Sequence, residues 1–138
     1  MSDIPARLRR LVTGRAGGRC EYCGLSQEGQ EATFHIDHIT PRVEDGPTTA
    51  ENLAWACVSC SLRKAARRSA RDPKTGRLVP LFHPRRQKWA EHFRWAGVKM
   101  IGLTPTGRGT VAALRMNRPL ILAIRHEEAA RGRFPPPS

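Results

Sequence analysis

Apolar residues recur at helical spacing close to the N-terminus of this 138-residue chain. Asp3 is a candidate N-cap, Pro5 falls in the first turn, and Gly14 follows the last apolar position. Proline at the start of a helix and glycine after its end are typical of helix boundaries. The pattern predicts a short amphipathic helix over residues 4–16, whose apolar positions are Ile4, Leu8, Leu11 and Val12.

The hydrophobic pattern changes in the middle of the chain and there predicts two strands. Residues 33–39 are rich in β-branched and aromatic side chains and run into Pro41, which ends a strand. The residues up to position 50 are rich in turn formers, and residues 53–55 are the candidate return strand. A helix over roughly residues 58–70 is expected to follow.

The second half of the chain mixes strand and helix patterns. Trp89, Phe93 and Trp95 are expected to pack in the core. Residues 131–138 contain three consecutive prolines and are expected to be a disordered tail. The expected elements are a strand at 77–82, a short helix at 85–89, a hairpin at 93–95 and 98–103, and helices from Thr104 to Met116 and from Asn117 to Ala130.

The length of the chain suits one domain with a modest core and is too short for two well-packed domains. We therefore expect a single α+β domain over residues 1–130. No stretch approaches the roughly 20 apolar residues of a membrane span, and the N-terminus has no apolar run of the signal-peptide type. These features predict a cytoplasmic protein that does not contact a membrane.

The charged residues are distributed unevenly. The net charge is +12, which favours a polyanionic partner, and nucleic acid is the commonest one. Residues 20–60 hold seven acidic side chains and one Arg, whereas residues 61–100 hold twelve Lys or Arg and two acidic side chains. The chain thus separates a segment suited to metal binding from a segment suited to phosphate binding.

The four cysteines form two Cys-x-x-Cys pairs, Cys20 with Cys23 and Cys57 with Cys60. Each pair can turn two thiolates toward one ion, and two pairs complete the tetrahedral coordination of zinc. The alternatives are unrelated buried thiols or a redox pair, but a redox motif is not expected in duplicate. Four thiolates leave no open position for a substrate, so we predict a structural Zn²⁺ and place the chemistry elsewhere.

The candidate chemistry lies between the two cysteine pairs, on the predicted strand. His35, Asp37 and His38 occur there within four residues. A histidine beside a carboxylate can bind a divalent cation and activate water. Taken alone, such a run is equally compatible with an ordinary surface cluster.

The order of motifs resembles that of the HNH endonucleases. It runs Cys-x-x-Cys, Asp-His-Ile-x-Pro, Asn-Leu and Cys-x-x-Cys-x-x-x-Lys, and it covers roughly residues 19–67. The matching residues are Cys20, Cys23, Asp37, His38, Ile39, Pro41, Asn52, Leu53, Cys57, Cys60 and Lys64. Residues 71–130 would then be a C-terminal α/β extension of the motif.

The resemblance implies a zinc-stapled ββα-metal core, also called a His-Me finger, that holds one catalytic Mg²⁺ or Mn²⁺. It implies that Asp37 ligates this ion and that His38 is the general base for hydrolysis of DNA, leaving 5′-phosphate and 3′-hydroxyl ends. A neutral imidazole near pH 7 suits the base. Asn52 would hold the hairpin loop and orient His38, although asparagine is also common in ordinary turns.

The chain departs from the family pattern at Ser61, where many members carry a His or Asn that binds the catalytic ion. Three outcomes are open: Ser61 binds directly or through water, His35 substitutes for it, or the site is impaired. His35 lies two residues before Asp37, so a regular strand places both on one face. The loop also departs slightly, with Asp45 where the family often has glycine.

Positive side chains recur after the second cysteine pair at spacings of one, three and four, which predicts a cationic helix face for phosphate contacts. We expect the partner to be double-stranded DNA, while the sequence leaves monomer or homodimer open. The alternative function is a zinc-stabilised nucleic-acid-binding module whose catalytic site has lapsed at Ser61. The predicted contact residues are Arg63, Lys64, Arg67, Arg68 and Arg71.

Overall fold

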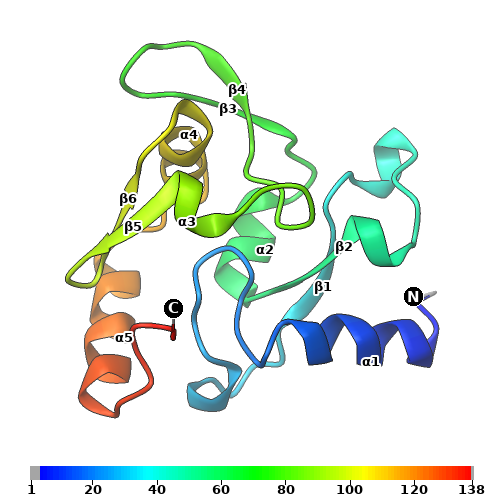
Figure 1. The fold of residues 1–138 in the computed structure, drawn as a ribbon, viewed down its shortest axis with the longest axis horizontal. Helices are drawn as coiled ribbons and strands as arrows, with labels where there is room; N and C mark the ends of the chain where they lie inside the picture. The colour runs from blue at the N-terminus through cyan, green and yellow to red at the C-terminus, as the bar shows by residue number, and fades with distance from the viewer. Residues whose placement is uncertain (1–3, 138) are drawn as a thin grey trace.

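The structure, a computed structural model, describes residues 4–137. At its centre two antiparallel strands, β1 (His35–His38) and β2 (Leu53–Ala56), are followed directly by helix α2 (Val58–Lys64). The N-terminal helix α1 (Ala6–Arg15) lies against β2 on one side of this unit (Figure 1). The fold is α+β with small antiparallel sheets, as predicted.

Strand β2 is the buried member of the central pair. All four of its residues are buried, whereas those of β1 are exposed or half-buried. The register sets Asp37 opposite Ala54 and His38 opposite Leu53. The guanidinium of Arg15, at the end of α1, donates to the Leu53 carbonyl at 2.6 Å. Strand β1 is therefore fixed by a packed neighbour while its polar side chains stay near the surface.

Helix α2 ends at Lys64, six residues before the predicted end at Ala70. Ala65 has φ 47°, which breaks the helix, and residues 69–71 pair with another strand instead. The residues after Lys64 have good helix propensity, so local preference favoured a longer helix. Strand pairing buries Ala70 and overrides that preference. The predicted cationic helix is therefore shorter than expected, and Arg67, Arg68 and Arg71 lie outside it.

The C-terminal half adds two hairpins and two helices around α2 (Figure 1). The carboxylate of Asp72 accepts hydrogen bonds from Arg108 at 2.9 and 2.8 Å and joins the first hairpin to the first of these helices. The predicted second hairpin and both final helices are present, and the Thr104 hydroxyl caps its helix by accepting from the Gly107 N–H. The elements are β3 (Ser69–Arg71), β4 (Leu78–Pro80), β5 (Phe93–Ala96), β6 (Lys99–Gly102), α4 (Pro105–Ala113) and α5 (Pro119–Ala130).

The short helix that precedes β5 is displaced from its predicted place. It is α3 (Trp89–His92) rather than residues 85–89, because residues 84–86 form a turn closed by hydrogen bonds to the His83 carbonyl. Trp89, the first residue of α3, packs against Phe93 of β5 as expected, with 5.2 Å between the ring centroids. Three short 3-10 helices complete the fold: η1 (Gln27–Gly29), η2 (Arg42–Glu44) and η3 (Ala50–Asn52).

Residues 131–137, expected to be a disordered tail, instead pack against the protein. Phe134 is 7% exposed and meets Trp95 edge-on, with 4.7 Å between ring centroids. The buried Phe134 ring holds this segment in place, although its proline content had suggested disorder. The predicted N-cap Asp3 lies outside the described residues. Among residues 4–137, no helix has the length and apolar character that crossing a membrane requires.

Candidate active site and metal centre

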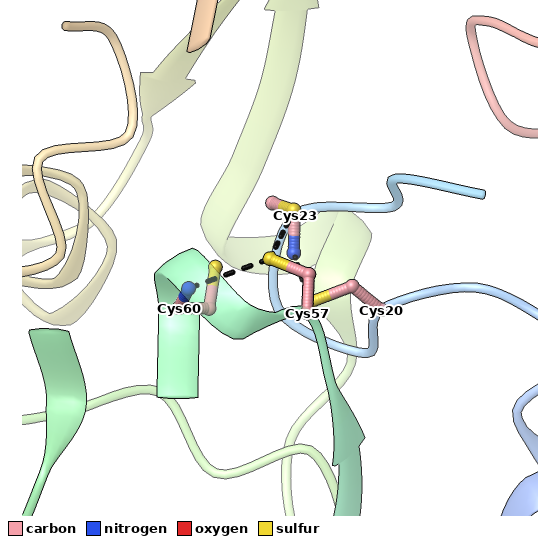
Figure 2. Close-up of side chains that lie close together, drawn as sticks. All are labelled: Cys20, Cys23, Cys57 and Cys60. Atoms are coloured by element: carbon pink, nitrogen blue, oxygen red, sulfur yellow. Dashed lines mark hydrogen bonds between the residues drawn. The ribbon is translucent and has the colours of Figure 1, made fainter. Parts of the chain in front are cut away.

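The four cysteines come together in the interior, as Figure 2 shows. Their sulfur atoms all lie within 4.8 Å of one another, and the side chains are buried and unoxidised. The Cys57 thiol also caps α2 by accepting from the Cys60 N–H at 3.4 Å. The second knuckle is therefore the first turn of the helix that carries the site residues.

The cysteine cluster fits a tetrahedral thiophilic ion. Zinc–sulfur bonds of about 2.3 Å place neighbouring sulfurs roughly 3.8 Å apart, and Cys23 and Cys57 Sγ are 3.7 Å apart. Hydrogen bonds from Cys20, Cys57 and Cys60 lower the pKa of Cys23, whereas contacts with Cys20 and Cys23 raise the pKa of Cys57. Ionisation of Cys23 is thus favoured at the expense of Cys57, and a bound cation would allow the thiols to ionise together. The cluster is a zinc-like metal site.

A buried arginine from α5 stands beside this cluster. Arg125 is 1% exposed, lines a small cavity with Cys23, Cys57 and Cys60, and donates to the Val98 carbonyl at 2.8 Å. Burial lowers its pKa, while the cysteines raise it. Four thiolates around Zn²⁺ carry an excess of negative charge, so a buried cation nearby is favourable.

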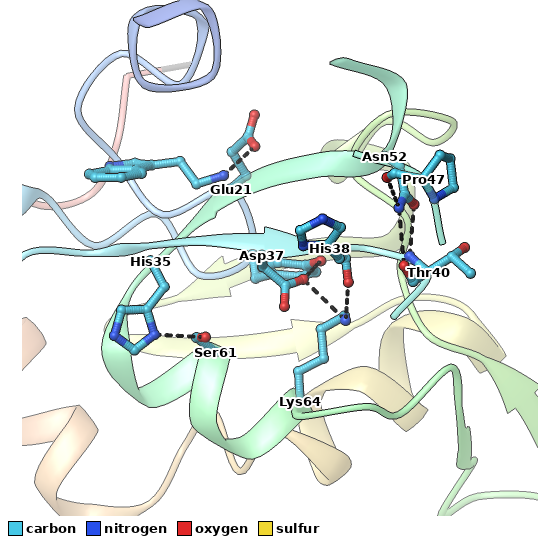
Figure 3. Close-up of polar contacts among 11 residues, drawn as sticks. Glu21, His35, Asp37, His38, Thr40, Pro47, Asn52, Ser61 and Lys64 are labelled. Atoms are coloured by element: carbon cyan, nitrogen blue, oxygen red, sulfur yellow. Dashed lines mark hydrogen bonds and ion pairs between the residues drawn. The ribbon is translucent and has the colours of Figure 1, made fainter. Parts of the chain in front are cut away.

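Strand β1 and helix α2 face each other through two polar pairs (Figure 3). His35 Nδ1 is 2.9 Å from Ser61 Oγ, and one turn further along α2 Lys64 Nζ is 3.1 Å from Asp37 Oδ2. The strand spacing of two and the helix spacing of three bring these pairs into line. His35 and Asp37 therefore share the face that meets α2.

Asp37 is largely enclosed. Its side chain is 9% exposed, and its Oδ2 receives both the Lys64 ammonium and the Tyr22 hydroxyl, the latter at 3.2 Å. Burial raises the pKa of Asp37, and Lys64 opposes this effect. Lys64 also donates to the His38 carbonyl at 3.2 Å. A protein cation thus already compensates the carboxylate expected to bind a divalent ion.

His38 is half-buried and faces the loop that joins the two strands. Its Nε2 is 2.9 Å from Thr48 Oγ1 and accepts from Arg42 Nε at 3.2 Å. Because an arginine nitrogen only donates, Nε2 must be the unprotonated nitrogen of a neutral ring. Burial lowers the pKa of His38 below 6.5, and Arg42 and Lys64 add to this effect. The ring is therefore neutral and basic at pH 7.

Asn52 closes the loop that contacts His38. It is buried, its Oδ1 accepts from the Thr40 N–H at 2.8 Å, and its Nδ2 donates to the carbonyls of Thr40 and Pro47 at 3.0 and 2.8 Å. Gly46 passes so close to the Thr40 carbonyl that a Cβ would clash. Asp45 takes the left-handed conformation, φ 62°, which aspartate tolerates better than most residues. The loop therefore keeps its tight shape without the second glycine.

Residues 20–67 match the family model of the HNH endonucleases. This segment begins at the first cysteine pair and contains β1, β2 and α2, which are the elements just described. We call this matching segment, residues 20–67, the HNH domain. A search among proteins of curated function finds no match to this chain.

The basic residues predicted to bind DNA differ in their surroundings. Lys64 is 1% exposed and belongs to the Asp37 pair, so its predicted place on the cationic surface is wrong. Arg68 lies 3.5 Å from Glu44, and Arg71 donates to the Gly76 carbonyl at 3.0 Å. Arg63 and Arg67 instead line a pocket between α2 and the C-terminal helices.

Four functional contacts of the HNH domain were not apparent from the sequence. They are the contacts of Tyr22 and Lys64 with Asp37, and of Arg42 and Thr48 with His38. Lys64 carried a signal as the last residue of the motif Cys-x-x-Cys-x-x-x-Lys, and Tyr22, which is buried, lies inside the first cysteine knuckle. Among the described residues, ligand atoms of three or more His, Cys, Asp or Glu converge only at the cysteines.

Proposed function

We propose that this protein is a divalent-metal-dependent endonuclease that hydrolyses phosphodiester bonds of double-stranded DNA. In this proposal His38 is the general base, Asp37 ligates the catalytic ion, and the products carry 5′-phosphate and 3′-hydroxyl ends. The observation that carries the proposal is the state of His38, whose unprotonated Nε2 is held at the end of β1 by Arg42 and Thr48. The four cysteines hold a structural Zn²⁺.

The proton transfer follows from the surroundings of His38. Thr48 Oγ1 lies 2.9 Å from Nε2, so a water that displaced this hydroxyl would lie within hydrogen-bond reach of the base. Nε2 takes the proton of the attacking water, and the imidazolium then returns it to solvent. Asn52 acts as a positioning residue, because its three hydrogen bonds hold the loop that supports this geometry.

Asp37 is the carboxylate that would hold Mg²⁺ or Mn²⁺, with His35 and Ser61 as further donors on the same face. When bound, such an ion supplies positive charge to the phosphate and to the departing 3′ oxygen. Magnesium sites commonly use one or two protein carboxylates completed by waters and substrate phosphates. Asp37 fits that donor set once Lys64 yields part of its contact, and both protein contacts of the carboxylate are on Oδ2.

The test is cleavage of supercoiled plasmid by the zinc-loaded protein with added Mg²⁺ or Mn²⁺. We expect nicking that needs the added ion and that falls about 10²- to 10⁴-fold in His38→Ala, the range for loss of a general base. Nicks with 5′-phosphate and 3′-hydroxyl ends should be resealed by DNA ligase without prior phosphorylation. His126→Ala is the matched control, because His126 is an exposed histidine on α5.

Zinc content and the thermal melt of His38→Ala should equal those of the wild type. Cleavage that persists in His38→Ala, or that needs no added divalent ion, would contradict the proposal. The reduced cysteines also suit a cytoplasmic location, which stays a prediction.

The Asp37–Lys64 pair favours a second function, because the Lys64 ammonium already occupies the carboxylate that would bind the catalytic ion. In that case the chain is a zinc-stabilised nucleic-acid-binding module whose catalytic site has lapsed. Such a module binds DNA in a salt-dependent manner yet cleaves it with no divalent ion. The same plasmid assay, paired with a binding measurement, separates the two functions.

A further inference from the structure

Three of the eight residues that line one arginine-rich pocket lie outside the segment that matches the HNH family. The pocket has a volume of about 620 Å³ and lies between α2 and the turn that joins α4 to α5. We call it the arginine pocket, and its charged residues are Arg63, Arg67, Arg115 and Arg118. No acidic side chain lines it.

Two of these arginines have unused donors. Arg63 and Arg118 are half-buried, and the Nε of each is buried with no hydrogen-bond partner within residues 4–137. Arg118 also donates from Nη2 to Ser59 Oγ at 3.1 Å, which fixes its position beside the second cysteine knuckle. A buried unpaired donor costs free energy, so a shift of either guanidinium toward an acceptor would be favourable.

Arg115 reaches the pocket from a strained turn. Its φ is 48°, in the left-handed region, where a residue other than glycine costs about 1 kcal/mol or more. The turn is closed by hydrogen bonds from the Arg115 and Met116 N–H groups to the carbonyls of Ala112 and Val111. The exposed Arg115 side chain therefore stands at the rim of the pocket on a fixed backbone.

A second basic cleft lies next to the arginine pocket, near the end of β1. Arg67 lines both cavities. The second cleft, of about 260 Å³, is also lined by Ile39 and Thr40, which directly follow His38. Its other charged or titratable residues are Lys64, Arg68, His83 and Arg86. A cationic path thus leads from the end of β1 across Arg67 to Arg115 and Arg118.

We infer that the arginine pocket binds a backbone phosphate of the nucleic-acid substrate, several nucleotides from the bond that is cut. This inference rests on the proposed function, because the second cleft is lined by Ile39 and Thr40, which directly follow the proposed base His38. Guanidinium groups suit phosphate oxygens through paired N–H donors, and such contacts position a duplex without reading its sequence. The C-terminal extension would therefore complete the substrate surface of the HNH domain.

The test measures binding without cleavage, so that it does not depend on catalysis. Every protein carries His38→Ala, and anisotropy of a fluorescent 20-base-pair duplex gives Kd over a range of salt concentrations. We expect the double variant Arg115→Gln/Arg118→Gln to bind roughly 10- to 100-fold more weakly, as loss of charged hydrogen bonds predicts. The slope of log K against log salt should also shrink by about 0.9, the value for one phosphate.

The control double variant is Arg94→Gln/Arg131→Gln, which removes the same charge from exposed positions. Arg94 lies on β5, and Arg131 follows the far end of α5, where it pairs with Glu127. An unchanged Kd in the pocket variant, or an equal loss in the control, would overturn the inference.

The exposed Arg115 offers a single variant, Arg115→Gln, that removes no hydrogen bond shown by the structure for its side chain. It should retain the wild-type melt and still weaken binding several-fold, whereas unchanged binding would contradict the pocket. Because cleavage is absent throughout, failure of this test leaves the nuclease proposal standing. Conversely, a lapsed nuclease would still show the binding loss.

Discussion

At the cysteine cluster four ligand atoms already converge on one point, whereas on β1 the single carboxylate, Asp37, already has a protein cation beside it. The two regions are separated only by the length of α2, whose N-cap is Cys57 and whose last residue is Lys64. The cysteine cluster can bind an ion without rearrangement. The second has an ordered histidine, His38, which we propose as the base, and a carboxylate, Asp37, which would have to exchange Lys64 for an ion.

The cysteine cluster and the surroundings of His38 are therefore held in place by different sets of contacts. The cysteines are fixed by buried packing, and their geometry serves the fold. His38 is fixed by a loop that Asn52 and Gly46 hold, and its neutrality needs no ion. The structure therefore supports general-base chemistry more directly than it supports divalent-ion binding.

The largest expected effect comes from breaking the cysteine cluster. Cys57→Ser removes one thiolate and the cap of α2, and structural zinc sites contribute roughly 10 kcal/mol or more, which is comparable to the whole stability of a small domain. We expect loss of bound zinc and of the cooperative thermal transition, measured by metal analysis and circular dichroism. Val58→Ala, in the same knuckle, should keep both. A Cys57→Ser protein that melts like the wild type would remove the contrast between the two regions.

A smaller effect is expected at the Asp37–Lys64 pair. Lys64→Gln leaves a buried carboxylate without its cation and should destabilise the protein by about 3–5 kcal/mol in urea unfolding. The double variant Asp37→Asn/Lys64→Gln should recover much of this loss, since no charge is then left unpaired. Added Mg²⁺ should stabilise Lys64→Gln more than the wild type, because the ion takes the vacated position. Equal Mg²⁺ effects on both proteins would count against Asp37 as the ion ligand.

The smallest expected effect concerns the pH dependence that the pKa of His38 sets. Its pKa is lowered by burial and by Arg42 and Lys64, so the neutral base persists to a lower pH than in a free histidine. Cleavage should therefore be fully present above pH 6.5 and be lost only as the pH falls through the lowered pKa. Arg42→Gln should move this acidic limb of kcat/KM upward, toward 6.5. An apparent pKa of 6.5 or higher for the acidic limb of the wild-type kcat/KM profile would contradict the environment described for His38.

The sequence by itself determined the ββα unit, the four-cysteine cluster and the order of the last helices. These features depend on local signals: paired knuckles, a β-branched strand ended by Pro41, and the Thr104–Pro105 helix start. Such signals involve neighbouring residues, so they can be recognised without knowledge of the three-dimensional arrangement. The same holds for the shared face of His35 and Asp37, which follows from the period of a strand.

Only the tertiary structure decided where Lys64 and the arginines point. Helix propensity favoured a helix that continued to Ala70, but residues 69–71 pair with β4 and the helix ends at Lys64. Packing of α2 against β1 places the Lys64 side chain beside Asp37. The neighbours of His38 and the arginine pocket likewise join residues distant along the chain. Long-range packing fixes such contacts, and no local pattern of hydrophobic and polar residues encodes them.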